Sequence, residues 1–224
     1  MGILYLVRHG QASFGAADYD QLSELGARQC RELGHWFRRR GVVFEGVLRG
    51  TLQRHVQSLD ALAEGYGDLP PVLPWPGLNE YDGEALVRAA YPTLRQPVQA
   101  TSPEAYRTHF RLLREGLAQW MAGRTAPVGM PSWPDFVAGV TGALDHVRQQ
   151  YQGDVLIVSS GGPIATAVSL VLATPPQTMV ELNMRIRNSS LTEFAYTPRR
   201  HMLVSYNHLP HLDHPERLGW VTYA

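Results

Sequence analysis

The chain has 224 residues, a length that suits one domain or one domain with an insertion. Its 20 Lys and Arg balance its 20 Asp and Glu, which argues against a general nucleic-acid binder. A hydrophobic content of 44% excludes a disordered chain, and one cysteine excludes a disulfide framework or a cysteine-rich zinc site. No apolar run approaches the roughly 20 residues that span a bilayer. Residues 1–8 do not resemble a signal peptide, so we expect a soluble, cytoplasmic protein.

Predicted strands and helices alternate along the chain. The predicted strands are residues 3–7, 42–48, 154–160, 191–196 and 201–206. The predicted helices are a first one from an N-cap at Ser23 to about residue 40, and then residues 52–63, 106–120, 136–147 and 164–172, the last opened by Pro163. Residues 11–21 and the proline-rich residues 70–83 are predicted to be loops, the second a surface loop with little regular structure.

Two features of this pattern predict the fold class. The apolar runs at residues 3–7 and 155–158 are typical of strands buried on both faces, as in a parallel sheet. The last two strands are joined by a short turn over residues 197–200, which indicates a hairpin at the sheet edge. We therefore predict a single-domain, three-layer α/β/α sandwich over residues 1–224. It has a mostly parallel central sheet, an antiparallel edge hairpin and a helical cap or insertion at about residues 84–150.

Three predicted strand ends carry chemically useful side chains, and such ends meet at one edge of an open α/β sheet. Arg8 and His9 follow the first strand, and Arg54 begins the helix after the second. Residues 159–162, Ser-Ser-Gly-Gly, precede a helix N-terminus, which favours anions. Two guanidiniums without a carboxylate partner repel each other, so this arrangement predicts a bound tetrahedral oxyanion.

His9 is the candidate nucleophile, because an unprotonated imidazole nitrogen can attack phosphorus and flanking cations lower its pKa. Gly10 allows the backbone to approach a ligand closely. Glu80, in a loop, could give a proton to a leaving oxygen, and Asp82 and Glu84 compete for that role on sequence grounds.

Two other patterns in the sequence do not predict a functional site. The histidines near the C-terminus, with Asp213 beside them, are interrupted by prolines and predict a solvated tail rather than a metal site; they are His208, His211 and His214. Ser160 lacks the preceding glycine of a serine-nucleophile elbow.

Several segments resemble the histidine phosphatase superfamily, also called phosphoglycerate mutase-like. They occur in the order of that family, from the N-terminus almost to the C-terminus. The similar segments are residues 6–10 (Leu-Val-Arg-His-Gly), 22–29 (around Leu-Ser-Glu-Leu-Gly), 50–58 (with Arg54), 78–80 (Leu-Asn-Glu), 155–164 (Val-Leu-Ile-Val-Ser-Ser-Gly-Gly-Pro-Ile) and 207–209 (Asn-His-Leu).

The resemblance implies phosphoryl transfer through a phosphohistidine on His9. Arg8 and Arg54 would hold the phosphoryl oxygens, and Glu80 would protonate the leaving oxygen and then activate water. A small phosphorylated substrate is implied, with inorganic phosphate or sulfate in the same pocket, and neither a metal nor another cofactor. The balanced charge and the short apolar runs predict no nucleic-acid or membrane partner, and the oligomeric state stays open.

The chain departs from the family pattern at two places. The second histidine of the family corresponds to Ser160, so we expect this hydroxyl, with the backbone N–H groups of Gly161 and Gly162, to complete the phosphate pocket. His55 or His208 could also reach into this pocket, and neither is assigned a role. Residues 11–15 (Gln-Ala-Ser-Phe-Gly) lack the acidic, Asn-containing segment of the mutases, which favours a phosphatase.

The sequence leaves two alternative functions open. One is a catalytically impaired protein that binds a phosphorylated ligand as a sensor or scaffold, and the other is a phosphoglycerate mutase-type phosphotransferase. The joint presence of the candidate nucleophile His9 and the candidate acid Glu80 favours a phosphomonoesterase.

Overall fold

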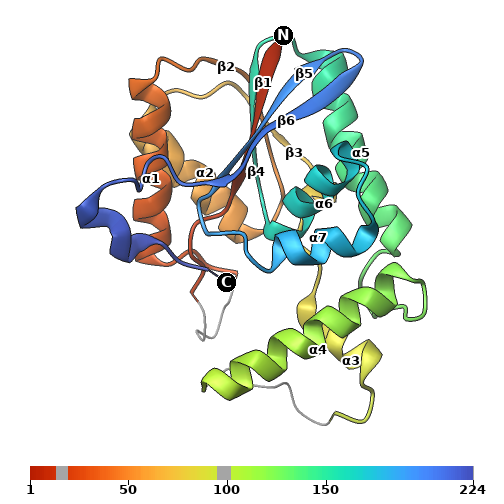
Figure 1. The fold of residues 1–224 in the computed structure, drawn as a ribbon. Coiled ribbons are helices and arrows are strands. Elements are labelled where there is room, and N and C mark those ends of the chain that lie inside the picture. Colours follow the sequence, from red (N-terminus) through yellow and green to blue (C-terminus); the bar gives the residue numbers. More distant parts are fainter. Residues whose placement is uncertain (14–19, 95–101, 224) are drawn as a thin grey trace.

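The computed structural model describes residues 1–13, 20–94 and 102–223. At its centre is a six-stranded sheet in the order β3-β2-β4-β1-β5-β6, with helices on both faces (Figure 1). The predicted three-layer α/β architecture is confirmed. Residues 14–19 of the predicted loop over residues 11–21 lie outside the described residues.

The parallel part of the sheet gathers the strand ends that carry the candidate residues. β1 (Gly2–Arg8) pairs with β4 (Asp154–Ser159), which pairs in turn with β2 (Phe44–Arg49). The register puts Arg8 opposite Ser159 and Arg49 opposite Val158, so the three strands end level with one another. The residues that follow each strand therefore lie at one edge of the sheet, as predicted.

The predicted edge hairpin is confirmed. β5 (Leu191–Thr197) runs antiparallel to β1, and β6 (Arg200–His208) runs antiparallel to β5. The mixed sheet thus has parallel strands on one side of β1 and the antiparallel hairpin on the other.

The prediction of a loop without regular structure over residues 70–83 is wrong in part. β3 (Val72–Pro74) pairs with β2 at the opposite edge of the sheet, and the 3-10 helix η1 (Pro76–Leu78) follows it. An edge strand leaves one side of its backbone without ladder bonds, so proline is tolerated there. This short strand carries the chain past the end of β2 and delivers Glu80 to the same edge.

One face of the sheet is covered by α1 (Glu24–Arg39) and α2 (Gln53–Tyr66) (Figure 1). The predicted caps of α1 are confirmed, because Ser23 Oγ accepts the Gly26 N–H (3.0 Å) and Gly41 has a φ of +65°. The apolar side chains of this layer form one buried cluster with the sheet, which includes Tyr5, Val7, Leu33, Phe37, Leu62, Leu156 and Val158.

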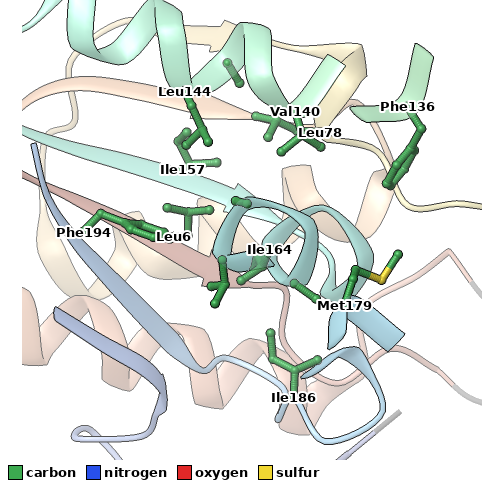
Figure 2. Close-up of a cluster of buried hydrophobic side chains, with 14 of the residues drawn as sticks. Leu6, Leu78, Phe136, Val140, Leu144, Ile157, Ile164, Met179, Ile186 and Phe194 are labelled. Carbon is green, nitrogen blue, oxygen red and sulfur yellow. The ribbon is translucent and has the colours of Figure 1, made fainter. Parts of the chain in front are cut away.

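The other face is covered by α5 (Trp133–Gln150), α6 (Gly161–Val171) and α7 (Pro176–Asn183). Leu6 and Ile157 point from the sheet toward Leu144 of α5 and Ile164 of α6 (Figure 2). α6 begins three residues earlier than predicted, and Pro163 still lies in its first turn, where no intrahelical N–H is needed. α7 has no counterpart among the helices predicted from the sequence.

α3 (Gly83–Ala90) and α4 (Pro103–Met121) extend beyond the sheet (Figure 1). Leu117 and Trp120 of α4 nevertheless belong to the cluster that contains α5 and the sheet. The boundary of a cap at about residues 84–150 stays a prediction, and its residues 95–101 lie outside the described residues. In the described part of the chain, no helix is both long enough and apolar enough to cross a membrane.

The prediction of a solvated C-terminal tail is wrong for part of the segment. His211 is 2% exposed, and its Nε2 lies 2.9 Å from Ser189 Oγ. The 3-10 helix η2 (Pro215–Trp220) follows, and the segment folds back over α1, where Gln29 Nε2 donates to the Trp220 carbonyl oxygen (2.6 Å). The prolines prevent a continuous helix, as expected, but they do not prevent packing.

Candidate active site

His9 lies at the carboxyl end of β1, and its backbone N–H donates to the Ser159 carbonyl oxygen of β4 (2.8 Å). Its Nδ1 is 2.7 Å from the carbonyl oxygen of Gly10. Because a carbonyl oxygen only accepts, Nδ1 carries the proton and Nε2 holds the lone pair. Burial, helped by the charges of Arg8 and Arg54, holds the pKa of His9 well below its usual 6.5. Nε2 is therefore unprotonated at neutral pH, as a nucleophile must be.

The turn after β1 is fixed on both sides. Arg8 is buried, and its Nη1 donates to the Ile186 carbonyl oxygen (2.6 Å) beyond α7. The Gly10 N–H donates to Ser58 Oγ on α2 (3.0 Å). A β-carbon on Gly10 would overlap the carbonyl oxygen of Gly26 on α1, so this close approach requires glycine.

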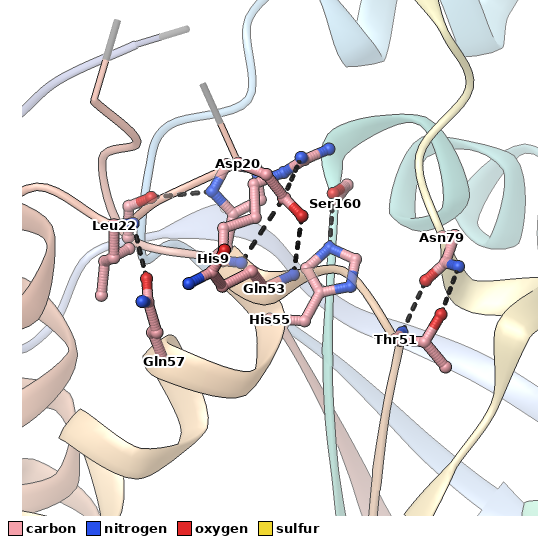
Figure 3. A network of polar contacts seen from close by, with 11 residues as sticks. His9, Asp20, Leu22, Thr51, Gln53, His55, Gln57, Asn79 and Ser160 are labelled. Atoms are coloured by element: carbon pink, nitrogen blue, oxygen red, sulfur yellow. Dashed lines mark hydrogen bonds and ion pairs between the residues drawn. The ribbon is translucent and has the colours of Figure 1, made fainter. Parts of the chain in front are cut away.

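Arg54 lies in the first turn of α2 and has a partner that sequence reasoning missed. Its Nη1 is 2.6 Å from Asp20 Oδ1, and Asp20 Oδ2 accepts the Gln53 N–H (2.8 Å) (Figure 3). The expectation that both guanidiniums lack a carboxylate partner is therefore wrong for Arg54. Asp20 lies 34 residues before Arg54 in the sequence, and no local pattern predicts such a contact. An anion that binds Arg54 would share this guanidinium with the Asp20 carboxylate.

Glu80 reaches the N-terminus of α6 from the segment after η1. Its Oε2 accepts the Gly162 N–H (3.0 Å) and its Oε1 accepts the Tyr81 N–H (3.2 Å). Burial raises the pKa of Glu80 above 4.5, against the opposing effects of these N–H groups and of Arg54 and Arg8. A carboxyl with a raised pKa beside two cationic side chains can hold and release a proton.

The two rival acids have other roles. Asp82 caps α3 by accepting the Ala85 N–H (2.9 Å), and its side chain is 56% exposed. Glu84 pairs with Arg88 on the surface of the same helix (3.1 Å) and is 60% exposed. Both therefore belong to the outer surface of α3, whereas Glu80 is partly buried and accepts two backbone N–H groups.

Ser160 is fully buried at the N-cap position of α6, where its side chain makes no capping hydrogen bond. Its Oγ lies 2.6 Å from Nε2 of His55 on α2 (Figure 3). Burial, followed by the charges of Arg54 and Arg49, lowers the pKa of His55 to about 3, so its ring is neutral. His208, the other histidine considered from the sequence, is exposed.

Two backbone N–H groups at the N-terminus of α6, those of Gly161 and Gly162, were predicted to bind an anion. The Gly162 N–H donates instead to Glu80, and Gly161 is the first residue of the helix. Within residues 1–13, 20–94 and 102–223, no group of three or more His, Cys, Asp or Glu side chains could hold a metal ion.

Comparison with known proteins identifies the family of the chain. The model of the histidine phosphatase superfamily (branch 1) matches residues 4–209. The chain belongs to this superfamily. None of the curated proteins compared with it matched.

Solved structures of histidine phosphatase-like proteins share the fold. YhfR of Bacillus stearothermophilus is 18% identical with a TM-score of 0.68, covering 94% of this chain and 99% of its own. A mutant phosphoserine phosphatase from Entamoeba histolytica in complex with phosphoserine is 19% identical (TM-score 0.62; coverage 95% and 100%). The mycobacterial glucosyl-3-phosphoglycerate phosphatase with VO3 is 22% identical (TM-score 0.64; coverage 92% and 99%). At these identities the likeness shows the fold alone.

Proposed function

We propose that the protein hydrolyses small phosphomonoesters through a phosphohistidine on His9. The observation that carries this proposal is the state of the His9 ring. Nδ1 donates to the neighbouring carbonyl oxygen, and the lowered pKa, to which the charges of Arg8 and Arg54 contribute, keeps Nε2 unprotonated. Such a nitrogen is suited to attack a phosphorus atom whose oxygens are held by guanidiniums.

The reaction has two steps. In the first, His9 Nε2 forms a bond to phosphorus, the ester P–O bond breaks, and the leaving oxygen takes the proton of the Glu80 carboxyl. In the second, the Glu80 carboxylate takes a proton from water, whose oxygen attacks phosphorus. The P–N bond then breaks and inorganic phosphate is released. The raised pKa of Glu80 supports its use as the acid in the first step.

The negative charge that develops in the transition state would be stabilised by side chains of the protein. Arg8 and Arg54 would bind the phosphoryl oxygens, with Gly10, Ser160 and Gly161 lining the pocket, and inorganic phosphate or sulfate would bind there as well. Because these guanidiniums supply the positive charge, we propose that the reaction requires no metal or other cofactor.

The substrate class is a small phosphorylated metabolite. The neighbouring structures include proteins whose ligands are phosphoserine, 3-phosphoglyceric acid and VO3, which supports a pocket for small phosphorylated or phosphate-like anions. The cytoplasmic location and the absence of nucleic-acid and membrane partners stay predictions from the sequence.

A hydrolysis screen tests this function. Phosphate release is measured from phosphoserine, phosphoglycerates, sugar phosphates and nucleotides, with and without a chelator, for the wild type and His9→Ala. We expect release by the wild type that a chelator leaves unchanged and that His9→Ala abolishes. Tight phosphate binding without turnover would instead identify a phospho-ligand sensor, and transfer to a second substrate hydroxyl would identify a mutase.

A further inference from the structure

A buried serine–histidine pair lies beside the candidate nucleophile. Ser160 and His55 are both 0% exposed, and their side chains meet at 2.6 Å between Oγ and Nε2 (Figure 3). The ring of His55 is 5.8 Å from the ring of His9, centroid to centroid. The pair comes from two different segments, the start of α2 and the N-cap of α6, and it is not a local motif.

The backbone makes room for the His55 ring. A β-carbon on Gly50 would overlap Nδ1 of His55, so the turn after β2 accepts this ring only because residue 50 is glycine. Nδ1 is buried and has no hydrogen-bond partner within the described residues. The hydrogen bond to Ser160 is thus the polar contact that the structure gives this ring.

Ser160 uses its hydroxyl in an unusual way for its position. A serine at an N-cap ordinarily accepts an N–H from the first turn of its helix. Here the side chain makes no such bond, and the Gly162 N–H goes to Glu80 instead. The Ser160 Oγ therefore contacts His55 and does not cap α6.

The unpartnered Nδ1 indicates which nitrogen of His55 carries the proton. A neutral imidazole has one N–H and one lone pair. If the proton were on Nδ1, a buried N–H would be left without an acceptor, which is rarer and costlier than an unused lone pair. With the proton on Nε2, His55 donates to Ser160 Oγ, and the Ser160 O–H is left to donate elsewhere.

Ser160 directly follows the part of β4 that pairs with the segment of the candidate nucleophile. Ser159, its neighbour, lies opposite Arg8 in the sheet and accepts the His9 backbone N–H (2.8 Å). The end of β4 thus runs alongside the segment that carries the nucleophile. We propose that His55 is a positioning residue that donates a hydrogen bond from Nε2 to Ser160 Oγ. This bond directs the Ser160 hydroxyl proton to an oxygen of the phosphoryl group while that group is transferred to or from His9.

This inference rests on the proposed function, so its test has readouts that do not need turnover. The variants are Ser160→Ala, His55→Leu, His55→Gln and the double variant His55→Leu/Ser160→Ala. Glutamine keeps an amide N–H close to the place of Nε2, while leucine removes the donor. The control is His201→Gln, a half-buried histidine beside Tyr196 at the opposite end of β5 and β6 from the site. Each variant is assayed for orthovanadate affinity, for the rate of enzyme phosphorylation and for its thermal unfolding midpoint.

We expect Ser160→Ala and His55→Leu each to weaken vanadate binding by about 10- to 100-fold, and to slow phosphorylation by roughly 100-fold. The double variant should be no worse than Ser160→Ala alone, because His55 acts through that hydroxyl. His55→Gln should recover most of the loss, and His201→Gln should change neither readout. Losses that multiply in the double variant, or unchanged vanadate affinity in the folded single variants, would overturn the inference.

A second measurement holds even if the variants fail to fold. Two-bond ¹⁵N–¹H correlation spectra of wild-type protein labelled at histidine report which ring nitrogen is protonated. We expect the Nε2–H tautomer for His55, and an Nδ1–H tautomer contradicts the proposed direction of the hydrogen bond. An acid-stable phosphoenzyme lost in Ser160→Ala would also refute it, since Ser160 would then be a nucleophile activated by His55. If the wild type binds vanadate but hydrolyses no phosphomonoester, the proposed function fails while the vanadate and tautomer results still decide this inference.

Discussion

Glu80→Gln separates the chemical role of the carboxyl from its structural role. Glutamine has nearly the same shape, and its carbonyl oxygen can still accept one of the two backbone N–H groups that hold Glu80, those of Gly162 and Tyr81. The backbone N–H that faces the glutamine amide nitrogen loses its acceptor, which costs about 1–3 kcal/mol of unfolding free energy. The variant should therefore fold, while it cannot give a proton to a leaving oxygen.

The size of the kinetic effect depends on the leaving group. For an alkyl phosphate, whose leaving alkoxide needs a proton, removal of the general acid should slow phosphorylation of His9 by roughly 10²- to 10⁴-fold. For p-nitrophenyl phosphate, whose leaving phenolate is a weak base, the same step should change little. Rapid-quench measurement of the first step with both substrates gives the comparison. Equal slowing for the two substrates would refute the assignment of Glu80 as the acid.

Stability gives an independent check on the environment of Glu80. Burial raises its pKa in the folded protein above 4.5, so the unfolded chain loses its proton first. The stabilising contribution of the protonated form is complete below the ordinary pKa and is lost as the pH rises through the raised one. The unfolding free energy of the wild type should therefore fall relative to that of Glu80→Gln across that interval. Chemical denaturation at a series of pH values measures the difference, and parallel curves would contradict the raised pKa.

Three further substitutions test other parts of the site. Asp20→Asn keeps a cap for α2 but removes the negative charge beside Arg54, so vanadate should bind more tightly by about 1 kcal/mol, roughly fivefold, in an equilibrium titration; weaker binding would contradict a competition for Arg54. Ser160→His should lower the unfolding free energy by about 1–3 kcal/mol, because Ser160 Oγ is 2.6 Å from His55 and a larger ring has no room there. Combination with His55→Ala should restore the stability, and a destabilisation that persists would refute overpacking as the cause. Burial lowers the pKa of His211 from 6.5 to about 3, so between these values the unfolded chain binds a proton that the folded protein does not, and stability falls as the pH drops. His211→Gln should therefore reduce the slope of the unfolding free energy against pH in this range by up to about 1.4 kcal/mol per pH unit. An unchanged slope would contradict the lowered pKa.

Sequence patterns were sufficient to predict the elements that have strong local signals. The apolar runs of β1 and β4, the Ser23 cap and the Gly41 end of α1 are all encoded in consecutive residues. The convergence of His9 and Arg54 followed from the rule that parallel strands end at one edge. The three-residue strand β3 was missed, because so short a segment has no periodicity and is formed by its pairing with β2.

The contacts that define the chemistry of the site were not predictable in this way. Asp20 meets Arg54, and Ser160 meets His55, across long stretches of chain. The difference between Glu80 and Asp82 is also a matter of tertiary burial, since both lie within one polar segment. The sequence suggested which residue types gather at the sheet edge, whereas their pairing and pKa values depend on how the helices pack.

The most direct test of the central proposal is to trap the phosphoenzyme. The enzyme is mixed with a ³²P-labelled phosphomonoester, quenched within milliseconds, and the protein-bound label is tested for stability in acid and in base. We predict acid-labile, base-stable phosphate that maps to His9 and is absent from the His9→Ala variant. Equal labelling of His9→Ala, or hydrolysis by the wild type with no protein-bound phosphate at any time, would contradict transfer through His9.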